Sequence, residues 1–183
     1  MLDNMPSSYE LDNEHEDSPA EFLVENVDLL PVGKVIDIAM GRGQNAVYLA
    51  ELGFDVEGVD ISEQSMSDAL QLAATKNVSI KAITSDLEKD YHIKDNTYDV
   101  IICFNYLQRS LMNQIKAGLK KGGILAYQTF IVDQARFGKP RNPDHLLMHN
   151  ELLDIFRDFR CLRYHEGIIP GPRAVAGIVA EKV

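Results

Sequence analysis

The chain has 183 residues, 45% hydrophobic and 25% charged, as expected for one soluble globular domain. No apolar run approaches the ~20 residues of a membrane helix, and the start lacks a secretory signal pattern, so we expect a cytoplasmic protein without a membrane partner. A net charge of −10 with no basic stripe disfavours long nucleic acid as a partner, and is compatible with a monomer or a homodimer.

The first segment, residues 1–17, contains six acidic residues and no Lys or Arg. We expect it to be an acidic flexible arm that precedes a single domain, residues 18–183. Ser18 as N-cap and Pro19 at the first helical position predict a helix that ends at Pro31.

After this helix, apolar strands alternate with amphipathic helices, and two strands follow one another at the end of the chain. The expected strands cover residues 34–39, 55–60, 78–84, 98–104, 123–130, 160–167 and 174–183, and the expected helices cover residues 43–53, 62–77, 107–123 and 149–159. This order predicts an α/β fold of the Rossmann-like, doubly wound type. Its seven-stranded sheet is mostly parallel, with a C-terminal antiparallel strand pair and helices on both faces.

The stretch "DIAMGRGQNA", residues 37–46, leaves the first strand of this sheet and opens a helix. Gly41 and Gly43 allow a ligand to approach the backbone closely, and a later acid, Asp60, stands where ribose hydroxyls would bind. The pattern formally fits a dinucleotide loop, so an NAD(P)-dependent oxidoreductase is one reading. Asp37 would repel a pyrophosphate, however, and the chain is short for a second substrate domain. A nucleoside with a zwitterionic amino-acid tail fits better.

These motifs resemble those of the class I S-adenosylmethionine-dependent methyltransferases, and more closely the small branch related to tellurite-resistance and thiopurine methyltransferases. The resemblance covers about residues 18–183 and includes, in order, "VIDIAMGRG", "GVDIS", "SDLE", "YDVIICFNYL" and "LKKGGILAYQTF". Ala39 stands where the family pattern has its first glycine, which costs little if its φ is negative.

The resemblance implies S-adenosylmethionine as cofactor and S-adenosylhomocysteine as product. It implies that Asp60 binds both ribose hydroxyls, and we expect replacement of Asp60 to leave the stability of the unliganded protein unchanged. The implied cofactor-binding residues are Asp37, Ala39, Met40, Gly41, Gly43, Asn45, Asp60, Ile61, Asp86, Leu87, Phe104 and Asn105.

On the substrate side we expect a small-molecule methyl acceptor: a thiol, a chalcogen oxyanion, or a small aromatic or anionic compound. The expected acceptor-binding residues are Tyr106, Phe130, Arg136 and Arg141, and the candidate catalytic residues are Tyr106, Arg109 and Tyr127. A non-catalytic module that senses the cofactor remains a further alternative.

No metal is expected. His145 and His149 have the spacing of metal ligands on a helix, but no third ligand stands near them in the sequence. Cys103 and Cys161 are far apart, and the apolar strand around Cys103 predicts a core position rather than a nucleophile.

Overall fold

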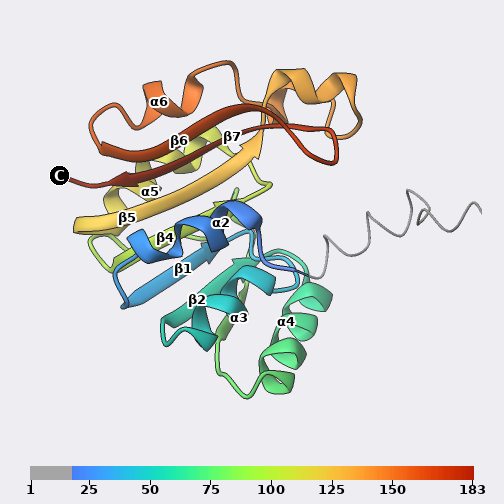
Figure 1. Ribbon diagram of the computed structural model, residues 1–183. Coiled ribbons are helices and arrows are strands. Elements are labelled where there is room, and N and C mark those ends of the chain that lie inside the picture. Colours follow the sequence, from blue (N-terminus) through green and yellow to red (C-terminus); the bar gives the residue numbers. More distant parts are fainter. Residues whose placement is uncertain (1–17) are drawn as a thin grey trace, which may run out of the picture.

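The computed structural model describes residues 18–183, which form a seven-stranded sheet with helices on both faces (Figure 1). The predicted arm, residues 1–17, lies outside the described residues. The strands are β1 (Lys34–Ile38), β2 (Asp55–Asp60), β3 (Lys81–Thr84), β4 (Tyr98–Phe104), β5 (Leu119–Phe130), β6 (Arg160–Ile169) and β7 (Arg173–Glu181). Their order in the sheet is β3-β2-β1-β4-β5-β7-β6.

Strands β1 to β5 are parallel to one another, and β7 is antiparallel to both of its neighbours, β5 and β6. The last strand of the sequence therefore lies inside the sheet, while β6, which precedes it, forms an edge (Figure 1). The predicted doubly wound sheet with a C-terminal antiparallel pair is confirmed.

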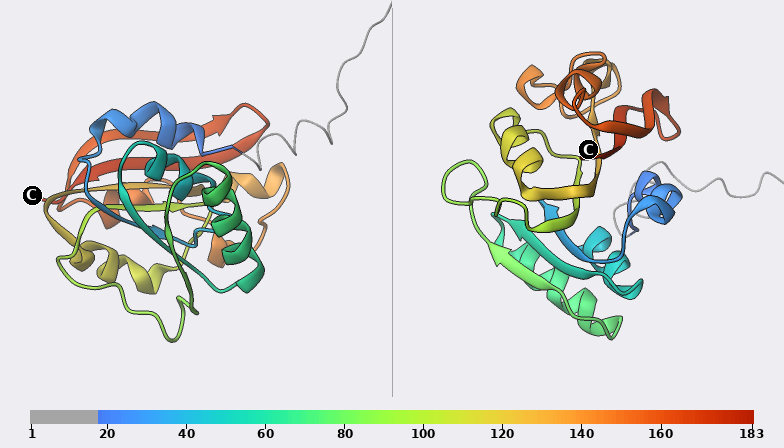
Figure 2. Two further views of the ribbon diagram at one scale, coloured as in Figure 1. Left: turned by 90° about the horizontal axis from the view of Figure 1, so that it is seen from below. Right: turned by 90° about the vertical axis from the view of Figure 1, so that its left-hand side faces the viewer.

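The helices are α2 (Glu21–Asn26), α3 (Gln44–Glu51), α4 (Glu63–Thr75), α5 (Met112–Gly118) and α6 (Glu151–Ile155), with short 3-10 helices η1 (Val27–Leu29), η2 (Arg109–Leu111), η3 (Val132–Arg136) and η4 (Pro143–His145). Helices α2, α3 and α4 cover one face of the sheet, and α5 and α6 cover the other (Figures 1 and 2). The apolar residues of each group form a core with that face. No helix within residues 18–183 has the length and apolar character needed to cross a membrane.

Several predicted helix ends are wrong; for example, the helix predicted over residues 149–159 spans only Glu151–Ile155. The first helix begins at Glu21 with Ala20 as its N-cap, and the backbone N–H of Ala20 donates to Asn45 Oδ1 at 2.8 Å instead of to a Ser18 cap. The helix predicted to reach Gly123 ends at Gly118, because Leu119 is already extended and pairs with Tyr98 of β4 as the first residue of β5. The predicted cap of α4 is confirmed, since the Ser62 hydroxyl accepts from Ser65 N–H at 3.1 Å.

The parallel strands β1, β2 and β4 end at the same edge of the sheet, and the predicted glycine loop leaves the sheet there. Alternation along β1 places Ile36 and Ile38 in the core beneath α5 and α6, and Val35 in the core beneath α2 and α3. Asp37 therefore points to the α2 and α3 side, the side on which the glycine loop joins α3.

Candidate functional site

The loop between β1 and α3 contains two glycines with positive φ, Gly41 at +56° and Gly43 at +83°. A Cβ at Gly41 would have no described heavy atom within 4 Å, so this glycine faces open space. A Cβ at Gly43 would lie 2.6 Å from the Cβ of Ala69, so Gly43 lets α3 approach α4 closely. Both positions therefore need glycine for their left-handed backbone conformation. Gly41 also leaves room for a ligand, whereas Gly43 also lets α3 pack closely against α4.

Ala39 has φ +56°, a left-handed conformation that costs a residue with a Cβ about 1–2 kcal/mol. From the sequence, alanine is expected to cost little here if its φ is negative, and the observed positive φ does not meet that condition. Met40, the next residue, turns its buried side chain onto β2, where its Sδ would lie 2.0 Å from a Cβ at Gly58. Met40 therefore packs in the core, and only its backbone forms part of the loop.

Asp37 lies beneath this loop and is only 1% exposed. No hydrogen bond within residues 18–183 reaches its Oδ2 atom. Desolvation by burial, together with the nearby Asp60 carboxylate, raises the pKa of Asp37 well above its usual range. The site therefore contains a buried acceptor atom that has no donor among the residues that the structure describes.

Asp60, at the end of β2, connects the glycine loop to the start of α4. Its Oδ2 accepts from Gly41 N–H at 2.9 Å, and its Oδ1 accepts from Ser62 N–H at 3.0 Å. Each carboxylate oxygen has a further lone pair for a ligand hydroxyl. Because Asp60 also supports the loop, the expectation that its replacement leaves stability unchanged is revised.

Ile61 follows Asp60 and is 66% exposed, so its apolar side chain is accessible beside the glycine loop. The loops after β2 and β3 are joined by a hydrogen bond from Ser85 N–H to the Asp60 carbonyl at 3.0 Å. Asp86 then accepts from Glu88 N–H and from Lys89 Nζ, each at 2.8 Å, and the hydrogen bond from Lys89 lowers the pKa of Asp86. Leu87 is buried in the core on the α5 and α6 side.

At the end of β4, Phe104 is buried and Asn105 adopts φ +56°, which turns the chain away from the sheet. Tyr106 follows, and burial raises the pKa of its phenol to about 12. Tyr127, expected as a candidate catalytic residue, is instead 1% exposed in the core, where its hydroxyl donates to the Tyr106 carbonyl at 2.6 Å. Tyr127 therefore fixes the loop that carries Tyr106 from behind.

A cavity of about 590 Å³ opens beside Tyr106, at the carboxyl ends of β4 and β5. Its walls combine apolar and cationic side chains: Asn105, Tyr106, Leu107, Phe130, Lys139, Pro140, Arg141, Asn142 and His145. Several of them belong to residues 131–149, which we call the covering segment. The structure thus brings together three of the predicted acceptor-binding residues, Tyr106, Phe130 and Arg141.

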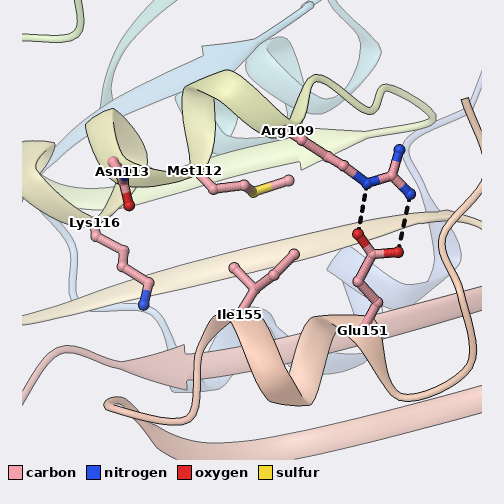
Figure 3. A pocket seen from close by; sticks show the side chains of 6 residues that line it. All are labelled: Arg109, Met112, Asn113, Lys116, Glu151 and Ile155. Carbon is pink, nitrogen blue, oxygen red and sulfur yellow. Dashed lines mark hydrogen bonds and ion pairs between the residues drawn. The ribbon is translucent and has the colours of Figure 1, made fainter. Parts of the chain in front are cut away.

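Arg136 and Arg109 are not among the residues that line this cavity. Arg136 is 75% exposed and pairs with Asp133 at 3.2 Å, and His149 pairs with the same carboxylate at 2.6 Å. Arg109 lines a separate groove of about 250 Å³ between α5 and α6, where it forms a bidentate ion pair with Glu151 (Figure 3). We therefore revise the acceptor-binding role expected for Arg136 and the catalytic role expected for Arg109.

Gln134 was not predicted, although it is buried and connects the covering segment to the sheet. Its Oε1 accepts from Ala174 N–H at 2.8 Å, and its Nε2 donates to the Lys139 carbonyl at 3.1 Å. In the sequence, Gln134 is a polar residue in a connection that looks solvated. Its role could not be predicted, because its hydrogen-bond partners stand 5 and 40 residues away.

Comparison with known proteins agrees with this geometry. A family described as "Methyltransferase domain" matches residues 35–123, which include the glycine loop and Asp60. The probable S-adenosyl-L-methionine-dependent methyltransferase TehB of Haemophilus influenzae is 27% identical over 154 residues, 80% of this chain and 52% of that protein. The crystal structure of TehB from this organism superimposes with a TM-score of 0.74 at 24% identity, covering 88% of this chain and 61% of that one. The chain thus contains a methyltransferase domain, residues 35–123, and is similar to class I S-adenosylmethionine-dependent methyltransferases.

Other relatives of this methyltransferase domain are considerably longer than the part they share with it. Phosphoethanolamine N-methyltransferase 3 of Arabidopsis thaliana is 32% identical over 127 residues, which are 66% of this chain and 25% of that protein. The chain thus spans from a quarter to about half the length of these curated relatives.

Proposed function

We propose that this methyltransferase domain transfers a methyl group from S-adenosylmethionine to a small-molecule acceptor. The observation that carries the proposal is the buried carboxylate of Asp37 beneath the open glycine loop, with Oδ2 lacking a donor within residues 18–183. A cationic amino group complements two neighbouring carboxylates, Asp37 and Asp60, whereas a pyrophosphate is repelled by them. The site thus suits an amino-acid tail better than a dinucleotide.

The other residues of this edge fit the remaining parts of the same cofactor. Gly41 leaves open space for it, and Asp60 has the lone pairs needed to accept from ribose hydroxyls while it holds Gly41 and Ser62. The exposed side chain of Ile61 offers an apolar surface for the adenine ring, and Asp86 offers an acceptor for its amino group. Asn45 is assigned a supporting role, because it binds the backbone of Ala20.

S-Adenosylmethionine supplies a methyl group on a sulfonium that already carries a good leaving group. The chain then has to orient the acceptor and exclude water, and orientation alone is worth effective molarities of about 10⁵ M or more. Tyr106 and Phe130 provide the apolar walls for this purpose. With a pKa of about 12, the Tyr106 phenol stays protonated at neutral pH and serves as a hydrogen-bond donor, not as a base.

The acceptor cavity favours a small compound with an apolar body and a negative charge. Lys139 and Arg141 line it, and no carboxylate is among its lining residues within the described chain. We assign the anion recognition expected of Arg136 to Lys139 and Arg141 instead.

The deciding experiment measures formation of S-adenosylhomocysteine with a panel of small thiols, phenols, carboxylates and metalloid oxyanions. We expect turnover with at least one of these compounds. Binding of S-adenosylhomocysteine without turnover of any acceptor would favour a cofactor-sensing module. Calorimetric binding of NAD in preference to S-adenosylhomocysteine would favour the oxidoreductase.

An Asp60→Asn variant is expected to bind S-adenosylhomocysteine about tenfold more weakly, as measured by calorimetry. Its free energy of unfolding should also fall by about 1–3 kcal/mol. Both oxygens of Asp60 accept from a backbone N–H, and in asparagine one of these oxygens becomes an NH₂ donor that cannot accept. Asp55→Asn, at the exposed opposite end of β2, serves as the control and should change neither property. Unchanged affinity in Asp60→Asn would remove Asp60 from the cofactor site.

An Arg141→Ala variant is expected to raise KM for an anionic acceptor about three- to tenfold and to leave the affinity for S-adenosylhomocysteine unchanged. Arg136→Ala is a matched control, because it removes an arginine of the same covering segment that does not line the cavity. Equal effects of the two substitutions on KM would show that Arg141 acts only through the general charge of the segment.

A further inference from the structure

The guanidinium of Arg109 binds the covering segment, and Arg109 is not among the residues that line the acceptor cavity. Its Nε donates to Glu151 Oε1 at 2.6 Å and its Nη2 to Glu151 Oε2 at 2.9 Å, the two contacts drawn in Figure 3. Nη1 donates to the Asp144 carbonyl at 2.9 Å, and Nη2 donates also to the Leu146 carbonyl at 2.8 Å. One side chain thus binds a carboxylate and two backbone carbonyls in a single fork, which lysine cannot do.

Glu151 completes this arrangement from the other side. Its Oε2 also accepts from Met148 N–H at 2.7 Å, while the hydrogen bond from Arg109 lowers the pKa of Glu151. Together, Arg109 and Glu151 bind the backbone at Asp144, Leu146 and Met148. We call these two side chains the clamp.

The clamp connects two walls of the acceptor cavity that are distant in the sequence. Arg109 opens η2, directly after the loop that supplies Tyr106 and Leu107 to one wall. His145, which lines the facing wall, lies between the two carbonyls that Arg109 binds.

The base of the covering segment is anchored independently of the clamp. Leu147 N–H donates to the Phe130 carbonyl at 2.9 Å, and the Leu147 carbonyl accepts from Val132 N–H at 3.0 Å. Leu146 and Leu147 are also buried. Loss of the clamp is therefore expected to release the η4 turn, Pro143–His145, without unfolding the domain.

We propose that Arg109 and Glu151 are positioning residues that fix the η4 turn against the Tyr106 loop and thereby set the width of the acceptor cavity. This role rests on the proposed function for the identity of the cavity, and it replaces a catalytic role for Arg109. The clamp acts on acceptor binding through backbone geometry, and the charge of Arg109 is neutralised by Glu151.

The chain offers a matched control for the clamp in the ion pair between Lys116 and Asp158, 2.5 Å long. It also connects α5 to the region of α6, its partners are likewise 42 residues apart, and Lys116 lines the same groove (Figure 3). Within residues 18–183, Asp158 pairs with Lys116 and not with the covering segment, so Asp158→Asn removes an ion pair between the same layers but leaves the η4 turn held.

The test compares Arg109→Gln, Arg109→Lys and Asp158→Asn with the wild type in three measurements: backbone hydrogen exchange of residues 142–148, calorimetric affinity for S-adenosylhomocysteine, and KM and kcat for the panel compound that the wild type methylates fastest. In Arg109→Gln we expect faster exchange of residues 142–148, a KM raised about tenfold, a kcat within about threefold, and unchanged cofactor affinity. Arg109→Lys should be intermediate, and Asp158→Asn should match the wild type. Simple destabilisation would instead lower kcat, through a smaller active fraction, and leave KM unchanged.

The proposal is overturned if exchange of residues 142–148 is unaltered in Arg109→Gln, if exchange rises while KM does not, or if Asp158→Asn raises KM equally. Absence of turnover with every panel compound would refute the proposed acceptor class. In that case the clamp is judged on hydrogen exchange: faster exchange confined to residues 142–148 supports it, and unaltered or global exchange refutes it.

Discussion

A Gly41→Val variant is expected to fold and to lose measurable affinity for S-adenosylhomocysteine. Gly41 has φ +56°, and a Cβ there would meet no described heavy atom within 4 Å, so the valine side chain would project into the space assigned to the cofactor. The left-handed backbone costs a residue with a Cβ about 1–2 kcal/mol, and a β-branched one somewhat more. A domain of this size tolerates that loss, whereas a blocked loop cannot bind.

Gly53→Val is a matched control for this substitution. Gly53 follows α3, has φ +90°, and also has open space where a Cβ would stand. Both variants should lose similar amounts of unfolding free energy in urea titrations, and only Gly41→Val should lose binding in calorimetry. If Gly41→Val folds and binds as the wild type does, the loop is a simple turn and the cofactor site lies elsewhere.

An Asp37→Asn variant is expected to be more stable than the wild type at neutral pH without ligand, and to bind the cofactor poorly. Burial raises the pKa of Asp37 in the folded state above its unfolded value, so its contribution to stability is full below about pH 4 and is lost as pH rises through the folded pKa. Asparagine does not titrate. The stability difference should therefore grow as pH rises above about 4, to about 1–3 kcal/mol.

The measurement is a series of urea unfolding curves between pH 4 and pH 8, with and without S-adenosylhomocysteine. Saturating ligand should reverse the order of stability, because only the wild type presents a carboxylate to the cofactor. An Asp37→Asn variant that is less stable than the wild type at every pH would show that the carboxylate has a structural partner.

Asp99 should show the opposite dependence of stability on pH in the same unfolding experiment. Desolvation raises the pKa of Asp99, but the hydrogen bonds from Lys120 Nζ and Lys34 N–H, each 2.8 Å long, outweigh it, and the net pKa is lowered. Its stabilisation is present above about pH 4 and is lost as pH falls through the folded pKa. Asp99→Asn should therefore be less stable at neutral pH, by about 1 kcal/mol, with the difference fading toward acid pH.

Local patterns with local causes predicted much of the fold. The order of strands and helices, the cap at Ser62 and the antiparallel strand pair all follow from residues close to one another in the sequence. The end of α5 does not, because it depends on the pairing of Leu119 with Tyr98 of β4, about 20 residues earlier in the sequence. The conformation of Ala39 likewise depends on the loop around it.

In the candidate site, too, features with local causes could be predicted and features that depend on distant residues could not. The residues proposed to bind the cofactor stand in short motifs at strand ends, so the motifs and the resemblance that they carry could point to Asp37, Gly41 and Asp60. The roles of Tyr127 and Arg109 depend on where distant backbone carbonyls lie, and no spacing shows this. A tyrosine hydroxyl and an arginine guanidinium are common in active sites. Here the Tyr127 hydroxyl holds the Tyr106 loop, and the Arg109 guanidinium holds the η4 turn.

The position of β7 between β5 and β6 constrains how the chain assembles during synthesis. β6 emerges from the ribosome before β7, yet within the described sheet its partner is β7. Until β7 has been made, the open edge of β5 and the unpaired β6 coexist, and a direct pairing of the two would exclude β7. The Ala174 backbone that binds Gln134 also belongs to β7, so the covering segment gains this anchor only once β7 has inserted. The β1–β4 half of the sheet, with its glycine loop, is thus available to form first, and the acceptor cavity is completed last.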